Sequence, residues 1–125
     1  MHKSSDFSRL DRINKTLAKH LAMIVQRELY DPRLAFINIT QVQVTPDLSE
    51  AKVYFTTVLD KEAEADQGKT LCKLLNKAQK HLRYVLAQEV DLRRTPKLYF
   101  HYDTKLIEAM RIGDLLRQSN NKEQD

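Results

Sequence analysis

Lysine and arginine side chains gather along one stretch of this chain in which acidic side chains are rare. Residues 69–97 contain eight Lys or Arg and only two Asp or Glu. Lys73, Lys77, Lys80 and Arg83 recur at spacings of three and four, so a helix would place them on one side. Such a row can neutralise the phosphates of a nucleic acid. A charged row can also be only the solvated side of a helix, but the scarcity of acids favours the nucleic-acid interpretation.

Two further groups of cations extend this prediction. Arg93 and Arg94 continue the row past the end of the helical pattern. A weaker row lies on the first helical segment, where Asp11 and Glu28 interrupt it. The predicted RNA-contact residues are therefore Arg12, Lys15, Lys19, Lys73, Lys77, Lys80, Arg83, Arg93 and Arg94. The tyrosines near this surface, which could stack on bases or equally be half-buried sheet residues, are Tyr84, Tyr99 and Tyr102.

Residues with the chemistry of an active site are few. His101 and Asp103 lie two apart and could form an acid–base pair or hold a metal, but a surface histidine and a helix cap explain them better. With only Gly68 and Gly113, the chain has no glycine-rich phosphate loop. Neighbouring lysines could lower the pKa of Cys72, although a semi-buried filler is the favoured role. We expect no catalysis, no cofactor, no metal and no small-molecule substrate.

Length and composition limit the class of protein. A chain of 125 residues corresponds to one domain, and its net charge of +4 with a pI near 9.2 indicates an acidic partner. The chain contains no apolar run near the roughly 20 residues that a membrane span needs. Its first residues lack the apolar core of a signal peptide, and its single cysteine excludes an internal disulfide. We expect a cytoplasmic monomer that does not bind membranes.

The first half of the chain predicts a helix followed by a hairpin. Apolar spacing predicts a helix from Ser8 to about Leu29, with Asp6 or Ser8 as its N-cap, and Pro32 ends it. The strand 36–44 follows, and its imperfect alternation predicts a β-bulge near Thr40-Gln41. After a turn at 45–49, residues 51–58 form the second strand of an antiparallel hairpin.

The second half predicts a long helix, a strand and a short helix. An acidic lead-in at 60–68 precedes a helical pattern that runs from Lys69 towards Glu89. Residues 97–102 form the third strand, and residues 105–117 form a final helix capped by Asp103 or Thr104. The predicted fold is therefore α+β, with helices packed on one face of a three-stranded sheet. The long crossover allows a parallel or mixed pairing of the last strand.

Several short fragments together resemble the ribosome-binding factor A family, a family of bacterial small-subunit assembly factors. Each fragment is weak alone, but their order across about residues 8–117 is specific. The fragments are Gln26-Arg27-Glu28 with Asp31-Pro32-Arg33, Asp47-Leu48 with Ala51-Lys52-Val53-Tyr54, Leu82-Arg83, and Pro96-Lys97-Leu98-Tyr99-Phe100 with Tyr102-Asp103 and Met110-Arg111-Ile112.

The resemblance implies a type II KH-like fold with the element order α-β-β-α-α-β, here followed by the short C-terminal helix. It also implies binding to the small ribosomal subunit and its RNA during late maturation, support for processing of the RNA ends, and no catalysis. On this basis residues 1–7 form a flexible N-terminus, residues 8–117 the RNA-binding domain and residues 118–125 a polar tail.

One position departs from the family pattern. The family has an Ala-x-Gly kink between two helices, and Ala78 matches its alanine, but Lys80 stands where the glycine is expected. Lysine favours a continuing helix more than glycine does. We therefore expect helix across 78–80 with at most a bend, and we hypothesise that Lys80 adds a phosphate contact.

Two other classes of function remain open. Residues 31–68 carry seven Asp or Glu against three Lys or Arg, so an acidic hairpin region could dock a basic ribosomal protein. Binding to protein-free RNA would separate that interaction module from an RNA-binding factor. An enzyme is a more distant alternative, and it would require a turnover that depends on His101 or Asp103.

Overall fold

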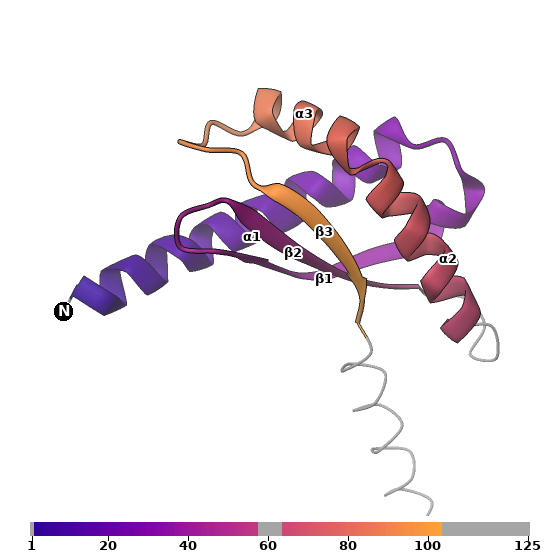
Figure 1. The fold of residues 1–125 in the computed structure, drawn as a ribbon, viewed down its shortest axis with the longest axis horizontal. Helices are drawn as coiled ribbons and strands as arrows, with labels where there is room; N and C mark the ends of the chain where they lie inside the picture. The colour runs from indigo at the N-terminus through magenta and orange to yellow at the C-terminus, as the bar shows by residue number, and fades with distance from the viewer. Residues whose placement is uncertain (1, 58–63, 104–125) are drawn as a thin grey trace, which may run out of the picture.

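A computed structural model describes residues 2–57 and 64–103 of the chain. The predicted final helix at 105–117 and the polar tail lie outside these residues. The elements are α1 (His2–Glu28), a 3₁₀-helix η1 (Pro32–Phe36), β1 (Ile37–Val44), β2 (Glu50–Thr57), α2 (Glu64–Lys77), α3 (Gln79–Glu89) and β3 (Lys97–Tyr102). Figure 1 shows their arrangement. Over the described ranges, no helix is long and apolar enough to cross a membrane.

Helix α1 begins earlier than the sequence predicts. The helix starts at His2, so the prediction that Asp6 or Ser8 caps it is wrong, because both residues lie inside it. The proposed boundary between residues 7 and 8 stays a prediction. At the other end, Pro32 starts the 3₁₀-helix, and the Asp31 side chain accepts a hydrogen bond from the Arg33 N–H.

The sheet has the order β1-β2-β3, with an antiparallel pair followed by a parallel one. The predicted bulge is confirmed, because the register shifts between Ile39 and Gln41. Ile39 then lies opposite Phe55, and Val42 lies opposite Val53, so apolar residues on both sides of the bulge share one face.

Helices α1, α2 and α3 contribute side chains to a single core against that face. Leu21 of α1, Leu75 of α2 and Leu86 of α3 are fully buried in one cluster with Val53 and Phe100 of the sheet. Helix α1 packs on β1 and α3, and α2 and α3 pack on β3. The predicted α+β class and the order α-β-β-α-α-β are thereby confirmed for the described residues.

Two asparagines from helices bind the outer edges of the sheet. Asn14 of α1 accepts a hydrogen bond of 2.9 Å from the Val44 N–H on β1. Asn76 of α2 bonds twice to Phe100 on β3, accepting from its N–H at 2.9 Å and donating to its carbonyl oxygen at 3.1 Å. These bonds fix α1 and α2 in register with the sheet that they cover.

The long helical segment bends at one residue, as expected. Ala78 separates α2 from α3 with φ −89° and ψ 1°, and Lys80 lies within α3. The Ala78 N–H lies 3.2 Å from the Leu74 carbonyl oxygen and 3.1 Å from that of Leu75, so the helical hydrogen bonding continues through the bend. The lysine at position 80 needs no glycine-like backbone, because Leu48 is the one non-glycine residue with a positive φ in the described part of the chain.

Gly68 on α2 lies against an aromatic ring of the core. A Cβ at this position would lie 2.7 Å from Cγ and 2.8 Å from Cδ1 of Tyr102. The Tyr102 ring itself packs edge-on against Phe55, with ring centroids 5.6 Å apart. The ring is therefore held between α2 and the sheet, and it has little room to move away from an added methyl group.

We predict that Gly68→Ala destabilises the protein. Alanine improves helix propensity by about 1 kcal/mol, but overpacking against Tyr102 costs about 1–3 kcal/mol. Urea unfolding should therefore give a free energy of unfolding lower by about 1 kcal/mol. Lys69→Ala, an exposed change on the same helix, should stay within about 0.5 kcal/mol of wild type. A Gly68→Ala protein as stable as wild type would show that the ring moves freely.

Candidate nucleic-acid interface

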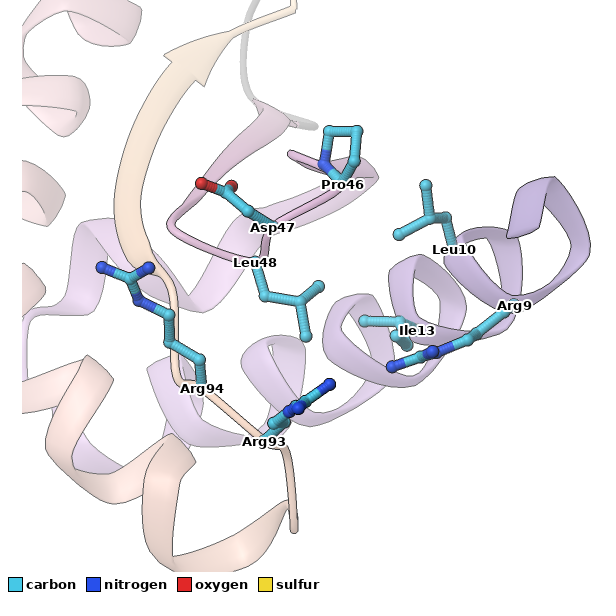
Figure 2. A pocket seen from close by; sticks show the side chains of 8 residues that line it. All are labelled: Arg9, Leu10, Ile13, Pro46, Asp47, Leu48, Arg93 and Arg94. Atoms are coloured by element: carbon cyan, nitrogen blue, oxygen red, sulfur yellow. The ribbon is translucent and has the colours of Figure 1, made fainter. Parts of the chain in front are cut away.

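Three arginines line a hollow between α1, the β1–β2 turn and the segment that leads into β3. The hollow has a volume of about 570 Å³ and is lined by Arg9, Leu10, Ile13, Pro46, Asp47, Leu48, Arg93 and Arg94. In Figure 2 the guanidinium groups of Arg9 and Arg93 point toward each other. Because Asp47 is the one acidic residue in the lining, we call this the arginine hollow, a surface suited to an anion.

The turn beside the arginine hollow is held by a network of short hydrogen bonds. The Asp47 carboxylate accepts from the hydroxyl groups of Ser49 and Thr45, each at 2.8 Å, and from the Ser49 N–H at 3.1 Å. These bonds, together with the positive charge of Arg94, lower the pKa of Asp47 to about 2. Leu48 adopts φ 60° in this turn and buries its side chain. The carboxylate is thus already engaged within the turn.

A second group of cations surrounds a smaller hollow beside the bend at Ala78. This hollow, of about 340 Å³, is lined by Asn76, Gln79, Lys80, Arg83, Lys97, Leu98 and Tyr99. Arg83 has a structural task there, because its Nε and one terminal nitrogen donate to the Thr95 carbonyl oxygen at 3.1 and 2.9 Å. The exposed cations of this kink hollow are therefore Lys80 and Lys97.

The other predicted residues lie apart from these hollows. Lys73 is exposed on α2, and Lys77 lines a separate hollow on the other side of the bend, beside Tyr30 and Pro32. The remaining three, all exposed on α1, are Arg12, Lys15 and Lys19. The Lys15 amine lies 3.3 Å from the Asp11 carboxylate, which partly neutralises it. The structure thus places Arg93 and Arg94 at one hollow and Lys80 and Arg83 at the other, but does not join all nine residues into one surface.

Arg9 and Lys97 belong to the two hollows but are missing from the predicted contact set. Arg9 stands three residues before Arg12, a spacing that could have placed it on the same row of the first helix. Lys97 stands directly after Pro96 at the start of β3. In each case the hollow is formed by segments far apart in the chain, so helical spacing alone could not identify it.

The candidate catalytic residues are placed in structural roles. The His101 ring lies 5.6 Å from the Tyr54 ring, and the Asp103 carboxylate accepts a 2.7 Å hydrogen bond from Thr40, the extra residue of the bulge. Burial raises the pKa of the Cys72 thiol, whereas nearby lysines could have lowered it. The raised pKa fits a semi-buried side chain that fills space in the core. Within the described part of the chain, no group of three metal-binding side chains occurs.

Of the three tyrosines that could either stack on bases or be half-buried in the sheet, two are exposed and one is half-buried. Tyr84 and Tyr99 are exposed, at 63% and 42% of their surface. Tyr102 is half-buried against Gly68 and Phe55 and belongs to the core layer. Only the first two are therefore placed to meet a base.

Comparison with known proteins identifies the family. The sequence model described as ribosome-binding factor A matches residues 9–116. The chain belongs to the ribosome-binding factor A family. A family member from Hahella chejuensis is 41% identical over 120 residues, covering 94% of this chain and 89% of the relative. A Vibrio vulnificus member is 38% identical and covers 96% and 89%, respectively.

Solved structures of the family share this fold. The crystal structure of ribosome-binding factor A from Thermus thermophilus aligns with a TM-score of 0.61 and 28% identity, covering 73% of this chain and 92% of that one. A homology model of the Thermus thermophilus protein, fitted into a cryo-EM map of a 30S–RbfA complex, aligns with a TM-score of 0.54 and 30% identity over 69% and 86%.

We predict that the Asp47 turn makes stability depend on acid pH. Because folding lowers the Asp47 pKa from 3.8 to about 2, the folded state favours the carboxylate. Its contribution is fully present above about pH 4 and is lost as the pH falls toward about 2. Asp47→Asn should therefore be less stable than wild type at neutral pH, and the difference should shrink through this window.

Urea unfolding at several pH values measures this dependence. Thr45→Val keeps the carboxylate but removes one hydroxyl donor, so it should lose part of the same pH dependence. Parallel pH profiles for wild type and Asp47→Asn would contradict the assignment of the low pKa to this turn.

Proposed function

We propose that this protein is a non-catalytic assembly factor that binds the small ribosomal subunit and its RNA during late maturation, and so supports processing of the RNA ends. The observation that carries the proposal is its 30% identity to the Thermus thermophilus protein that was fitted into a map of a 30S complex, over 86% of that chain. We further propose that it acts in the cytoplasm as a monomer.

The distribution of cations supports an RNA partner. Arg9, Arg93 and Arg94 line the arginine hollow together with a single carboxylate, that of Asp47, which is engaged within its own turn. Guanidinium groups bind phosphate oxygens through paired hydrogen bonds, and each contact releases condensed counterions. These contacts fix the position of the protein on RNA without reading its sequence.

A second set of phosphate contacts comes from the kink hollow and the neighbouring helix. Lys80 and Lys97 lie beside the bend, and Lys73 and Lys77 are exposed on α2. Arg83 acts as a positioning residue, since its bonds to Thr95 hold the segment that carries Arg93 and Arg94. The exposed α1 cations, Arg12, Lys15 and Lys19, complete the proposed set. Shape recognition of a folded RNA site would supply specificity.

The arginine hollow can be tested with a matched pair of variants. Arg9→Ala/Arg93→Ala should weaken binding to precursor small subunits. Each phosphate interaction that the variant removes should flatten the plot of log affinity against log salt by about 1. The control is Arg27→Ala/Arg33→Ala, which removes two positive charges that are paired with Glu89 and Asp31. The control should keep a salt slope close to that of wild type.

Filter binding or fluorescence anisotropy over a range of salt concentrations measures both quantities. Equal effects of the two double variants would mean that net charge alone matters, which would remove the arginine hollow from the interface. Binding to small subunits with none to protein-free RNA at moderate salt would instead favour a protein partner.

We also predict a cold-sensitive assembly defect in cells that lack the protein. A factor that binds one fold of an RNA site shifts the population toward it, and misfolded RNA helices persist longer in the cold. Deletion cells should accumulate free subunits and unprocessed small-subunit RNA ends, more strongly at low temperature. Sucrose gradients and end mapping at two temperatures measure this. Normal gradients and mature ends in the cold would contradict the assembly role.

A further inference from the structure

The face of the sheet opposite to the one on which α1, α2 and α3 pack carries a patch of aromatic and basic side chains. Alternate residues of β2 and β3 point to this side, since their neighbours in sequence are buried in the core. We call this patch the outer sheet face and define it by Lys52, Tyr54, Thr56, Lys97, Tyr99 and His101.

The aromatic rings of the outer sheet face lie on adjacent strands. In the parallel register, Lys52 is opposite Tyr99, and Tyr54 is opposite His101. Tyr54 and Tyr99 are therefore diagonal neighbours across strands that are about 4.8 Å apart. The Tyr54 and His101 rings already contact one another, with centroids 5.6 Å apart and an interplanar angle of 32°. Together they form a row of ring surfaces beside a lysine.

The chemistry of this face does not suit an apolar protein partner. Among the described strand residues that point to this side, none is aliphatic, and β1 adds Gln41 and Gln43. The charged side chains are Lys52, Lys97 and one acid, Glu50, which lies opposite Lys97. Positive charge, exposed rings and side-chain amides are the features with which proteins hold unpaired nucleotides.

The outer sheet face is also continuous with a surface already assigned to RNA. Lys97 and Tyr99 line the kink hollow together with Lys80, and both belong to the outer sheet face. A strand of RNA whose phosphate lies at Lys80 can therefore pass over the start of β3 and onto this face without leaving positive charge.

We propose that the outer sheet face binds a short single-stranded segment of RNA, with bases stacked on Tyr99 and Tyr54 and phosphates beside Lys52 and Lys97. The inference rests on the proposed function, because it names the form of RNA that one part of the surface takes. A duplex cannot stack in this way, because its bases are already paired and covered by their neighbours.

The probe for this site is a fluorophore-labelled hexauridylate, measured by anisotropy. Tyr99→Leu keeps apolar bulk but removes the ring, so affinity should fall on the order of tenfold, while Tyr99→Phe should bind like wild type. The matched control is Tyr30→Leu, which removes an exposed tyrosine that lies after the end of α1, away from the outer sheet face, and should leave affinity unchanged. Because no charge is removed, the salt slope of Tyr99→Leu should equal that of wild type.

The result that overturns the proposal is equal hexauridylate binding by wild type and Tyr99→Leu, or an equal loss for Tyr30→Leu. An equal loss of affinity for an RNA duplex would overturn it as well. An unchanged melting temperature of Tyr99→Leu shows that the fold is intact. If hexauridylate binding fails but precursor subunits still depend on Arg9 and Arg93, the assembly role stands and only the outer sheet face is excluded. If subunit binding is also absent, the proposed function fails with it.

Discussion

The two-sided character of this sheet depends on one inserted residue in β1. Without the bulge at Thr40, strict alternation would send either Ile39 or Val42 to the solvent side. The hydrogen bond from Thr40 to the Asp103 carboxylate joins the bulge to the residue that follows β3, across the whole width of the sheet. The face beneath α1, α2 and α3 is therefore mostly apolar, with Thr57 as its buried polar residue, and the opposite face is left to polar and aromatic side chains.

Because apolar side chains are directed into the core, the cations lie at the surface, where separate segments of the chain meet. The helices use their apolar sides on the core, so their lysines and arginines project outward around the bend and the turn. Arg83 and Asp47 stabilise these places, one by binding the Thr95 carbonyl oxygen and the other by accepting the hydroxyl groups of its own turn. The charged groups next to them, such as Lys80 and Arg93, are thereby held on a rigid frame, which reduces the entropy lost when they bind.

Features that depend on the spacing of residues within one helix or strand could be predicted from the sequence. The three strands, the bulge and the bend at Ala78 all follow from local spacing, backbone preference or family resemblance, and the structure confirms them. The predicted start of α1 was wrong because a capping residue can also lie within a helix. Arg9 and Lys97 were missed, and the bonds of Arg83 could not be foreseen, because those roles arise from contacts between segments that only folding brings together.

The two asparagines at the sheet edges limit how this protein can recognise a partner. At Val44 and at Phe100, a side-chain amide occupies the position that the backbone of an added strand would take. A peptide could extend the sheet at these points only after displacing a helix side chain, and aggregation by strand addition meets the same obstacle. At these two points, recognition is thus directed away from strand addition and toward side chains on the faces of the molecule.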